Sequence, residues 1–136
     1  DQENSTSHIR QCLEEIGVDR IDHGVNVLDD PALVAEVAGR GIGFTACPIS
    51  NSYVADGFKA AEIKAMLEAG LKVCINSDDP AYFPGYVTEN LLAVQAAAEL
   101  TQDQVVELVA NAFEIAWLDE PTRAQLRRRL DDYTAS

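Results

Sequence analysis

Hydrophobic positions recur at helical spacing in several stretches of the chain. The first helix is expected over about 5–16, where apolar residues share one side and a glycine is placed to end it: Ile9, Leu13, Ile16 and Gly17. A second helix is expected to begin at Asp30-Pro31 and to stop around 39–41, because aspartate caps a helix N-terminus and proline fits its first position. Further helices are predicted over about 60–69 and 88–100. Another is expected to begin at the capping box formed by Thr101 and Gln104, and a last one to begin at Glu120-Pro121.

Shorter runs of apolar and β-branched residues lie between these helices. They predict strands at about 20–23, 42–47 and 71–75. Helix and strand alternate along the chain, which is typical of a parallel sheet. Three parallel strands alone leave two open sheet edges, so the pattern fits either a compact doubly wound domain with poorly marked strands or part of a barrel. The segment 49–59 is expected to be a polar loop, and 81–87 an irregular loop with aromatic residues.

Polar side chains follow each predicted strand: His23, then Ser50-Asn51, then Asp78-Asp79. In parallel α/β folds, the active site lies at the carboxyl ends of the strands. Two carboxylates at the end of a buried strand are costly unless something positive lies near them. One aspartate would then hold a metal while the other accepts a hydrogen bond from a ligand. The alternative is turn chemistry, in which either aspartate caps the turn that Pro80 opens.

The other candidate side chains have a structural explanation as well as a functional one. A lone histidine is more often structural, but the place of His23 beside the aspartate pair favours a role in orienting or deprotonating a metal-bound water. Ser50 and Asn51 either bind a polar ligand or make a turn, and Tyr82 and Phe83 either line a ligand pocket or fill the core. The sequence has no nucleophile elbow and no Gly-rich phosphate loop, which disfavours a serine hydrolase and a nucleotide-binding domain.

Composition and net charge argue against some classes of binding partner. The 136 residues carry a formal net charge of −13. This charge argues against nucleic acid and anionic membrane as partners, because both need a basic face. The cluster Arg127-Arg128-Arg129 is expected near the end of the last helix, where it would interact favourably with the helix dipole. No run of residues is long and apolar enough to span a bilayer.

The cysteines indicate the compartment. Cys12, Cys47 and Cys74 lie far apart and show no CxxC spacing. Reduced, mostly buried thiols in a cytoplasmic protein fit this pattern best. The hydrophobic content of 47% is enough for one domain with a packed core. The chain does not begin with methionine and is expected to be a fragment.

Three motifs occur in order and carry a family resemblance. They are Arg20-Ile21-Asp22-His23-Gly24-Val25, Cys47-Pro48-Ile49-Ser50-Asn51 and Asn76-Ser77-Asp78-Asp79-Pro80-Ala81-Tyr82-Phe83. With these motifs, nearly the whole chain resembles the C-terminal half of the adenosine/adenine deaminase family. Asp22 in the first motif, together with the other two motifs, looks more like the adenine deaminase branch than the adenosine branch.

The resemblance implies a zinc-dependent hydrolytic deaminase on a (β/α)8 barrel, of which residues 1–136 would form one partial domain with about the sixth to eighth strands. Asp78 matches the family's aspartate zinc ligand, His23 the histidine that activates the metal-bound water, and Asp79 the carboxylate that contacts the purine's imidazole edge. The implied reaction converts a 6-aminopurine, in first place adenine, to hypoxanthine with release of ammonia. The other zinc ligands and the remainder of the barrel would lie outside this chain, covalently joined to it or on another chain.

One position departs from the family pattern. Gln2 stands where the proton-donating glutamate is expected, and a glutamine does not relay a proton as a carboxylic acid does. Its neighbour Glu3 is the catalytic candidate for that role. Three alternatives stay open: adenosine or another 6-aminopurine derivative as substrate, a catalytically inactive family member that binds a purine, and an unrelated small doubly wound binding domain.

Overall fold

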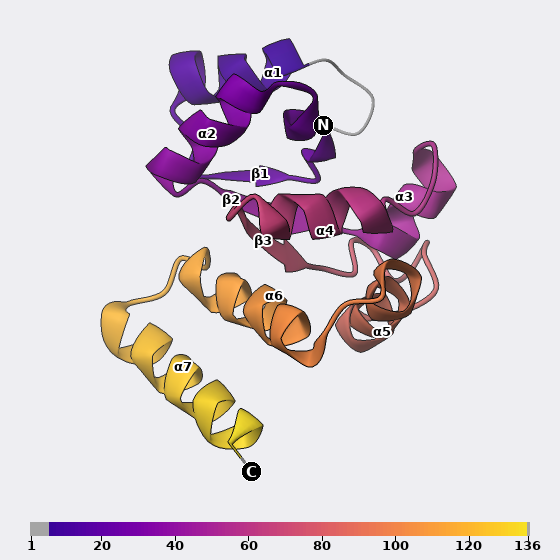
Figure 1. Cartoon of the computed structure of the whole chain (residues 1–136), viewed down its shortest axis with the longest axis vertical. Coiled ribbons are helices and arrows are strands. Elements are labelled where there is room, and N and C mark those ends of the chain that lie inside the picture. The colour runs from indigo at the N-terminus through magenta and orange to yellow at the C-terminus, as the bar shows by residue number, and fades with distance from the viewer. Residues whose placement is uncertain (1–5, 136) are drawn as a thin grey trace.

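The computed structural model describes residues 6–135 (Figure 1). Short strands alternate with helices along the chain, as the hydrophobic pattern predicts. The elements in order are α1 (Thr6–Gln11), the π-helix η1 (Cys12–Ile16), β1 (Arg20–Asp22), the 3-10 helix η2 (Val25–Asp29), α2 (Pro31–Arg40), β2 (Gly43–Ala46), α3 (Pro48–Val54), α4 (Ala60–Glu68), β3 (Lys72–Ile75), α5 (Val87–Ala98), α6 (Gln102–Glu114) and α7 (Glu120–Thr134).

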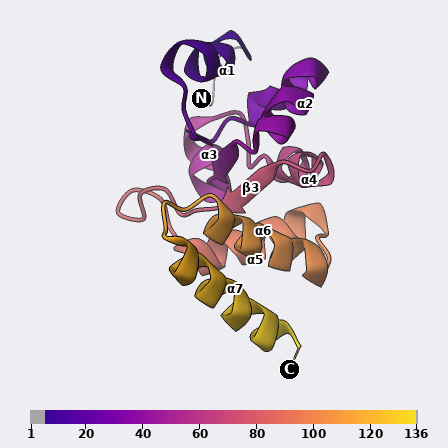
Figure 2. The same cartoon turned by 90° about the vertical axis from the view of Figure 1, so that its left-hand side faces the viewer.

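The strands form one parallel sheet in the order β1-β2-β3, which confirms the predicted sheet type. Arg20 pairs with Gly43 and Gly43 with Lys72, so the three strands begin level at one edge of the sheet. The central strand β2 is buried along its whole length. The helices α1 and α2 lie toward β1, α5 and α6 lie toward β3, and α7 is farther out (Figures 1 and 2).

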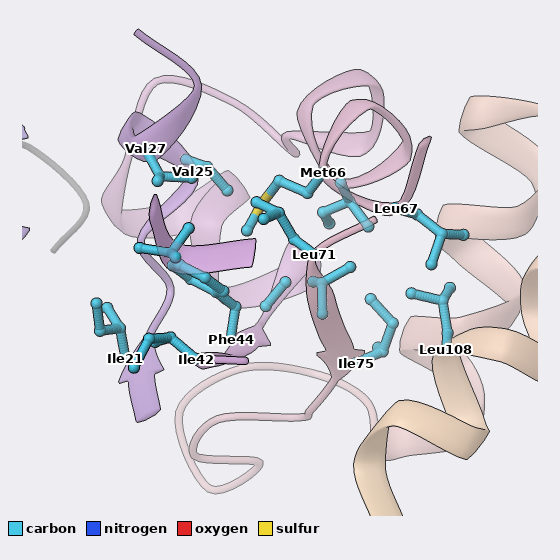
Figure 3. Close-up of a cluster of buried hydrophobic side chains, with 14 of the residues drawn as sticks. Ile21, Val25, Val27, Ile42, Phe44, Met66, Leu67, Leu71, Ile75 and Leu108 are labelled. Atoms are coloured by element: carbon cyan, nitrogen blue, oxygen red, sulfur yellow. The ribbon is translucent and has the colours of Figure 1, made fainter. Parts of the chain in front are cut away.

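The hydrophobic core lies between the sheet and the helices that cover it. Phe44 of β2, Val73 of β3 and Met66 of α4 are fully buried in one cluster. Figure 3 shows Leu108 of α6 beside Ile75 of β3, where α6 packs along the outer strand. Each such side chain contributes about 1.5–3 kcal/mol by leaving water, so this cluster holds the helices at fixed positions on the sheet.

The predicted helix starts are confirmed by their capping contacts. Asp30 Oδ1 accepts hydrogen bonds from the backbone N–H groups of Ala32 and Leu33, at 3.0 and 3.1 Å. Thr101 and Gln104 form the predicted reciprocal capping box at the start of α6. These caps satisfy N–H groups that have no partner within the helix, so each helix begins at a defined residue.

The polar loop expected over 49–59 is wrong in its first half. Residues Pro48–Val54 form the helix α3, with the proline at the first turn directly after β2. This helix is short, and its buried residues are Pro48, Ser50 and Asn51, while Tyr53 is 61% exposed. The usual apolar stripe is therefore absent, and proline after a strand was the available signal for a helix start.

The basic cluster of α7 does not lie at a helix end. The helix continues to Thr134, and its last turn contains no basic residue. The expected interaction of Arg127-Arg128-Arg129 with the helix dipole is therefore wrong. Arg127 Nε instead lies 3.5 Å from Asp131 Oδ1, one turn along the helix. Within residues 6–135, no helix combines the length and apolar character that a membrane crossing needs.

The turn between α6 and α7 packs against the N-terminal ends of the strands. A Cβ added at Gly43 would lie 2.6 Å from Ile115 Cβ, so this first residue of β2 must be a glycine for the turn to fit. The guanidinium group of Arg20 lies over the Trp117 ring, 4.6 Å from its centroid. Arg123 donates to the carbonyl groups of Phe113 and Leu118, both at 3.3 Å. This end of the sheet is thus closed by the chain's own C-terminal part.

Gly43→Ala is expected to destabilise the whole protein by about 1–3 kcal/mol, the usual cost of overpacking, because the new methyl group meets Ile115. Gly39→Ala is the matched control. Gly39 is exposed in α2 with no atom within 4 Å of an added methyl group, so helix propensity should stabilise this variant by about 0.5–1 kcal/mol. Urea denaturation midpoints compare the two variants, and equal midpoints would contradict the close packing of this turn.

Candidate active site

An open cleft of about 630 Å³ lies at the C-terminal edge of the sheet. Its walls come from β1, β2 and the turns that follow the three strands: Arg20, Asp22, His23, Thr45, Cys47, Asn76, Ser77, Asp78, Asp79 and Pro80. The strand ends therefore bring together residues that are up to 60 positions apart in the chain. This is the edge at which the sequence predicts the chemistry.

The backbone turns sharply where the two candidate residues leave the sheet. His23 N donates to Thr45 O and Asn76 N to Ala46 O, both at 2.8 Å, so the ladder continues for one residue beyond β1 and β3. His23 and Asp78 then adopt positive φ values of 60° each. This left-handed conformation costs a non-glycine residue on the order of 1 kcal/mol or more. Such strain is retained where the surrounding contacts hold the residue, as they do at both positions here.

His23 and Asp78 face each other across the end of β2. The distance from His23 Nε2 to Asp78 Oδ2 is 3.6 Å, and the side chains are 18% and 32% exposed. Ser50 Oγ donates to the same Asp78 Oδ2 at 2.6 Å. Asn51 Oδ1 lies 3.0 Å from His23 Nδ1. Four of the five polar side chains predicted after three different strands therefore form one connected cluster.

The inner wall of the cleft is polar as well. Thr45 Oγ1 donates to Asp22 Oδ1 at 2.5 Å, and Arg20 Nε lies 3.9 Å from the same oxygen. These contacts partly satisfy the Asp22 carboxylate, which is 73% exposed. The cleft can therefore hold water and a polar ligand.

Asp79 takes part in a turn. Its Oδ1 accepts a hydrogen bond from Ala81 N at 3.0 Å, and its carbonyl oxygen accepts from Tyr82 N and Phe83 N. This is the turn contact that the sequence left open as an alternative. It engages one of the two carboxylate oxygens, and Asp79 also lines the cleft, so its contact with a substrate stays a prediction. Tyr82 is 80% exposed and does not fill the core, while Phe83 lies 5.8 Å from the Tyr53 ring.

Three side chains of the site have atoms that metals bind. The ligand atoms of His23, Cys47 and Asp78 lie within 4.8 Å of one another. Burial, and after it the negative charges of Asp78 and Asp22, raise the pKa of the Cys47 thiol to about 12. The thiol is therefore protonated at neutral pH, and it donates to Thr45 O at 3.8 Å. Of the three groups, the Asp78 carboxylate is the one that the sequence prediction assigns to the metal, and the His23 imidazole lies beside it.

The geometry of these two groups fits a zinc ion. The tautomer of His23 that can donate to the Asn51 oxygen has its proton at Nδ1, and in that tautomer the Nε2 lone pair faces Asp78 Oδ2. Two acceptor atoms that face each other favour a cation or a proton near them. A carboxylate oxygen is a zinc ligand, and a catalytic zinc takes three protein ligands, so Asp78 is compatible with a zinc site that further ligands complete.

Sequence reasoning missed how the cluster is held in place. Ser50 and Asn51 were open between ligand binding and turn chemistry, and both are buried on α3 with hydrogen bonds to the candidate catalytic residues. Asn90 of α5 was not considered. It is fully buried; its Oδ1 accepts from Ile49 N at 3.0 Å and its Nδ2 donates to Tyr86 O at 2.9 Å. Gln2 and Glu3 lie outside the described residues.

Comparisons with known proteins agree on one family. The family model described as adenosine deaminase matches residues 2–133. A deaminase of Schizosaccharomyces pombe, itself uncharacterised, is 48% identical over 99% of this chain and 40% of its own length. The adenine deaminase of Rhodopseudomonas palustris is 46% identical over 98% of this chain and 40% of its length. This chain thus spans about two fifths of the curated relatives it matches.

Solved structures give the same result. The adenine deaminase of Arthrobacter aurescens superposes with a TM-score of 0.92 and 31% identity, over 99% of this chain and 42% of that one. A zinc-bound amidohydrolase from Burkholderia ambifaria superposes with a TM-score of 0.85 and 27% identity, over 95% of this chain and 37% of that one. The arrangement of strands and helices in this chain is therefore shared with these enzymes.

Iodoacetamide at pH 8 is expected to modify Cys74 far more slowly in the folded protein than after unfolding. Burial raises the pKa of this thiol to about 11, so only about one part in a thousand is the reactive thiolate at pH 8. An unfolded cysteine has a pKa of about 8.5. Peptide mass mapping against the half-buried Cys12 measures the difference, and folded Cys74 should react faster as the pH rises. Equal rates before and after unfolding would contradict the burial.

Proposed function

The chain belongs to the adenosine deaminase family, and from this premise we propose that the protein it is part of converts adenine to hypoxanthine and ammonia with the help of zinc. The observation that carries the proposal is the cluster of His23 and Asp78 at the ends of two parallel strands, beside an open polar cleft. The relatives named adenine deaminase support the substrate, since the match to them extends over almost the whole chain.

We further propose that this chain is one partial domain that supplies about the sixth to eighth strands of a (β/α)8 barrel. Among the described residues, β1 and β3 each pair with a strand on one side only, so each has an edge at which the barrel can continue. The incomplete coverage of the solved neighbours supports this arrangement. All three cysteines are free, which supports a reducing, cytoplasmic location.

The residues of the site take separate roles in this proposal. Asp78 would hold the zinc ion together with ligands outside this chain. When bound, zinc would supply Lewis acidity, which lowers the pKa of a coordinated water from about 15.7 to roughly 7. His23 would orient that water and accept a proton at Nε2. Asp79 would accept a hydrogen bond from the imidazole edge of the purine.

The net reaction shows which proton transfer the remaining groups must carry out. The water oxygen bonds to C6 of the purine, the bond from C6 to the amino nitrogen breaks, and that nitrogen leaves as ammonia. The departing amine needs a proton from an acid on the protein. Glu3 is the proposed donor in this chain, because Gln2 at the corresponding family position has no acidic proton to give.

Steady-state assays of the whole zinc-loaded protein test the proposal. Adenine is expected to be turned over with a higher kcat/KM than adenosine, and a chelator should abolish the activity reversibly. Asp78→Ala should lose zinc, because the site loses an anionic ligand, and elemental analysis measures this. A higher kcat/KM for adenosine than for adenine would show that adenosine is the preferred substrate. Purine binding without turnover would show an inactive family member, and full zinc occupancy in Asp78→Ala would overturn the ligand role.

His23 and Asp79 are expected to separate in their kinetic effects. His23→Ala should lower kcat by about 10²–10⁴-fold with little change in substrate binding, because general base catalysis contributes this much. Asp79→Ala should weaken binding of substrate and transition state alike by about 1.5–3 kcal/mol, the value of a hydrogen bond to a charged group. Asp132→Ala, which removes an exposed carboxylate of α7, is the control. If Asp79→Ala binds purine with unchanged affinity, the proposed substrate contact is wrong, and the role of Asp79 is limited to the turn.

A further inference from the structure

Asn51 is a buried polar side chain with no role in the mechanism above. It is only 1% exposed, in the first half of α3. A buried amide is unfavourable unless hydrogen bonds replace those it made with water. Its Oδ1 lies 3.0 Å from Nδ1 of His23, the ring nitrogen directed away from Asp78. The amide is thus placed to act on the proposed base without touching the cleft where the substrate would lie.

The position of α3 explains how it reaches both candidate residues. This helix follows β2, the middle strand, so it begins between the ends of β1 and β3. Successive residues of a helix point about 100° apart. Ser50 is thereby directed to Asp78, which follows β3, and Asn51 to His23, which follows β1.

The start of α3 is itself held in place. Asn90 of α5 accepts a hydrogen bond from Ile49 N and donates one to Tyr86 O, so it joins α3 to the start of α5. The close approach continues at Gly85, where an added Cβ would lie 3.0 Å from Ile49 Cδ1 and where φ is +118°. The Asn51 side chain therefore projects from a helix with little freedom to shift.

We propose that Asn51 is the positioning residue for His23: its amide oxygen holds the proton at Nδ1 and so directs the Nε2 lone pair toward Asp78 and the reacting water. This inference rests on the proposed deaminase function for its kinetic consequence, but the tautomer itself is a property of the chain. An amide oxygen can only accept, so the hydrogen bond excludes the tautomer in which Nδ1 is bare. Without it, the ring can rotate and protonate at Nε2, where it cannot act as a base.

A pair of isosteric variants tests the kinetic consequence in the whole protein. Asn51→Leu removes the acceptor and should lower kcat about 10- to 100-fold with little change in KM, the range for removing a group that orients a catalytic ligand. Asn51→Asp restores an acceptor at the same place and should recover a large part of this loss. Ser52→Ala is the control: this exposed hydroxyl, on the same helix, donates only to Ile49 O among its described contacts, and kcat should not change.

A double mutant separates positioning from a general structural role. If Asn51 acts through His23, then Asn51→Leu should cause little further loss of kcat once His23→Gln is present. Independent, multiplying losses would overturn the proposal. Equal thermal midpoints of Asn51→Asp and the parent show that the comparison concerns folded enzyme.

The tautomer of His23 can be measured by NMR, without an activity assay. In the zinc-free whole protein labelled with 15N-histidine, the His23 signals are those that disappear in His23→Gln. The expected spectrum has the proton at Nδ1 in the parent and in Asn51→Asp, and has Nε2 protonated in Asn51→Leu. If the leucine variant does not fold, a bare Nδ1 in the parent or in Asn51→Asp overturns the proposal. A protein without deaminase activity but with the proton at Nδ1 would refute the proposed function and leave the role of Asn51 standing.

Discussion

The pairing of β2 with both neighbouring strands is the constraint on which the site depends. Because the three strands run parallel and in register, the residues that follow them arrive at the same edge of the sheet. The backbone bonds from His23 N to Thr45 O and from Asn76 N to Ala46 O carry this register into the turns. The side chains of the cluster are thus brought together by the ladder, and their mutual hydrogen bonds act only to orient them.

Because the strand ladder, and not the hydrogen bonds of the cluster, fixes where these side chains lie, the turns that carry them can be strained. His23 and Asp78 both have left-handed backbones, which bulky and charged residues adopt at a cost. The cost is offset by the core beneath them, where Phe44 and Val73 are fully buried. A site built on a well-packed sheet tolerates such strain, whereas an isolated loop would relax.

The sequence predicts the sheet and the site edge well because both follow from short-range patterns. The strand ends and the Asp30 cap are visible as residue types at known spacing. The helix α3 is not visible in this way, because two of its three buried residues are polar and it is fixed from outside by Asn90 of α5, 41 positions away from Ile49. The place of the arginines in α7 depended on where this polar helix ends, and no glycine or proline marks its C-terminal end. Contacts between distant polar residues are what local patterns cannot supply.

The hydrogen-bond partners of Asp78 and His23 decide what chemistry the cluster can do. Within residues 6–135, Asp78 receives one hydroxyl donor from Ser50, and its nearest basic atom is His23 Nε2. A ring that donates its Nδ1 proton to Asn51 Oδ1 presents its Nε2 lone pair to that carboxylate. Burial raises the pKa of the Cys47 thiol to about 12, so without a metal ion this third group of the cluster is protonated at neutral pH. A carboxylate oxygen and an imidazole nitrogen thus lie 3.6 Å apart beside an open cleft, and a zinc site there needs further ligands from outside these strands.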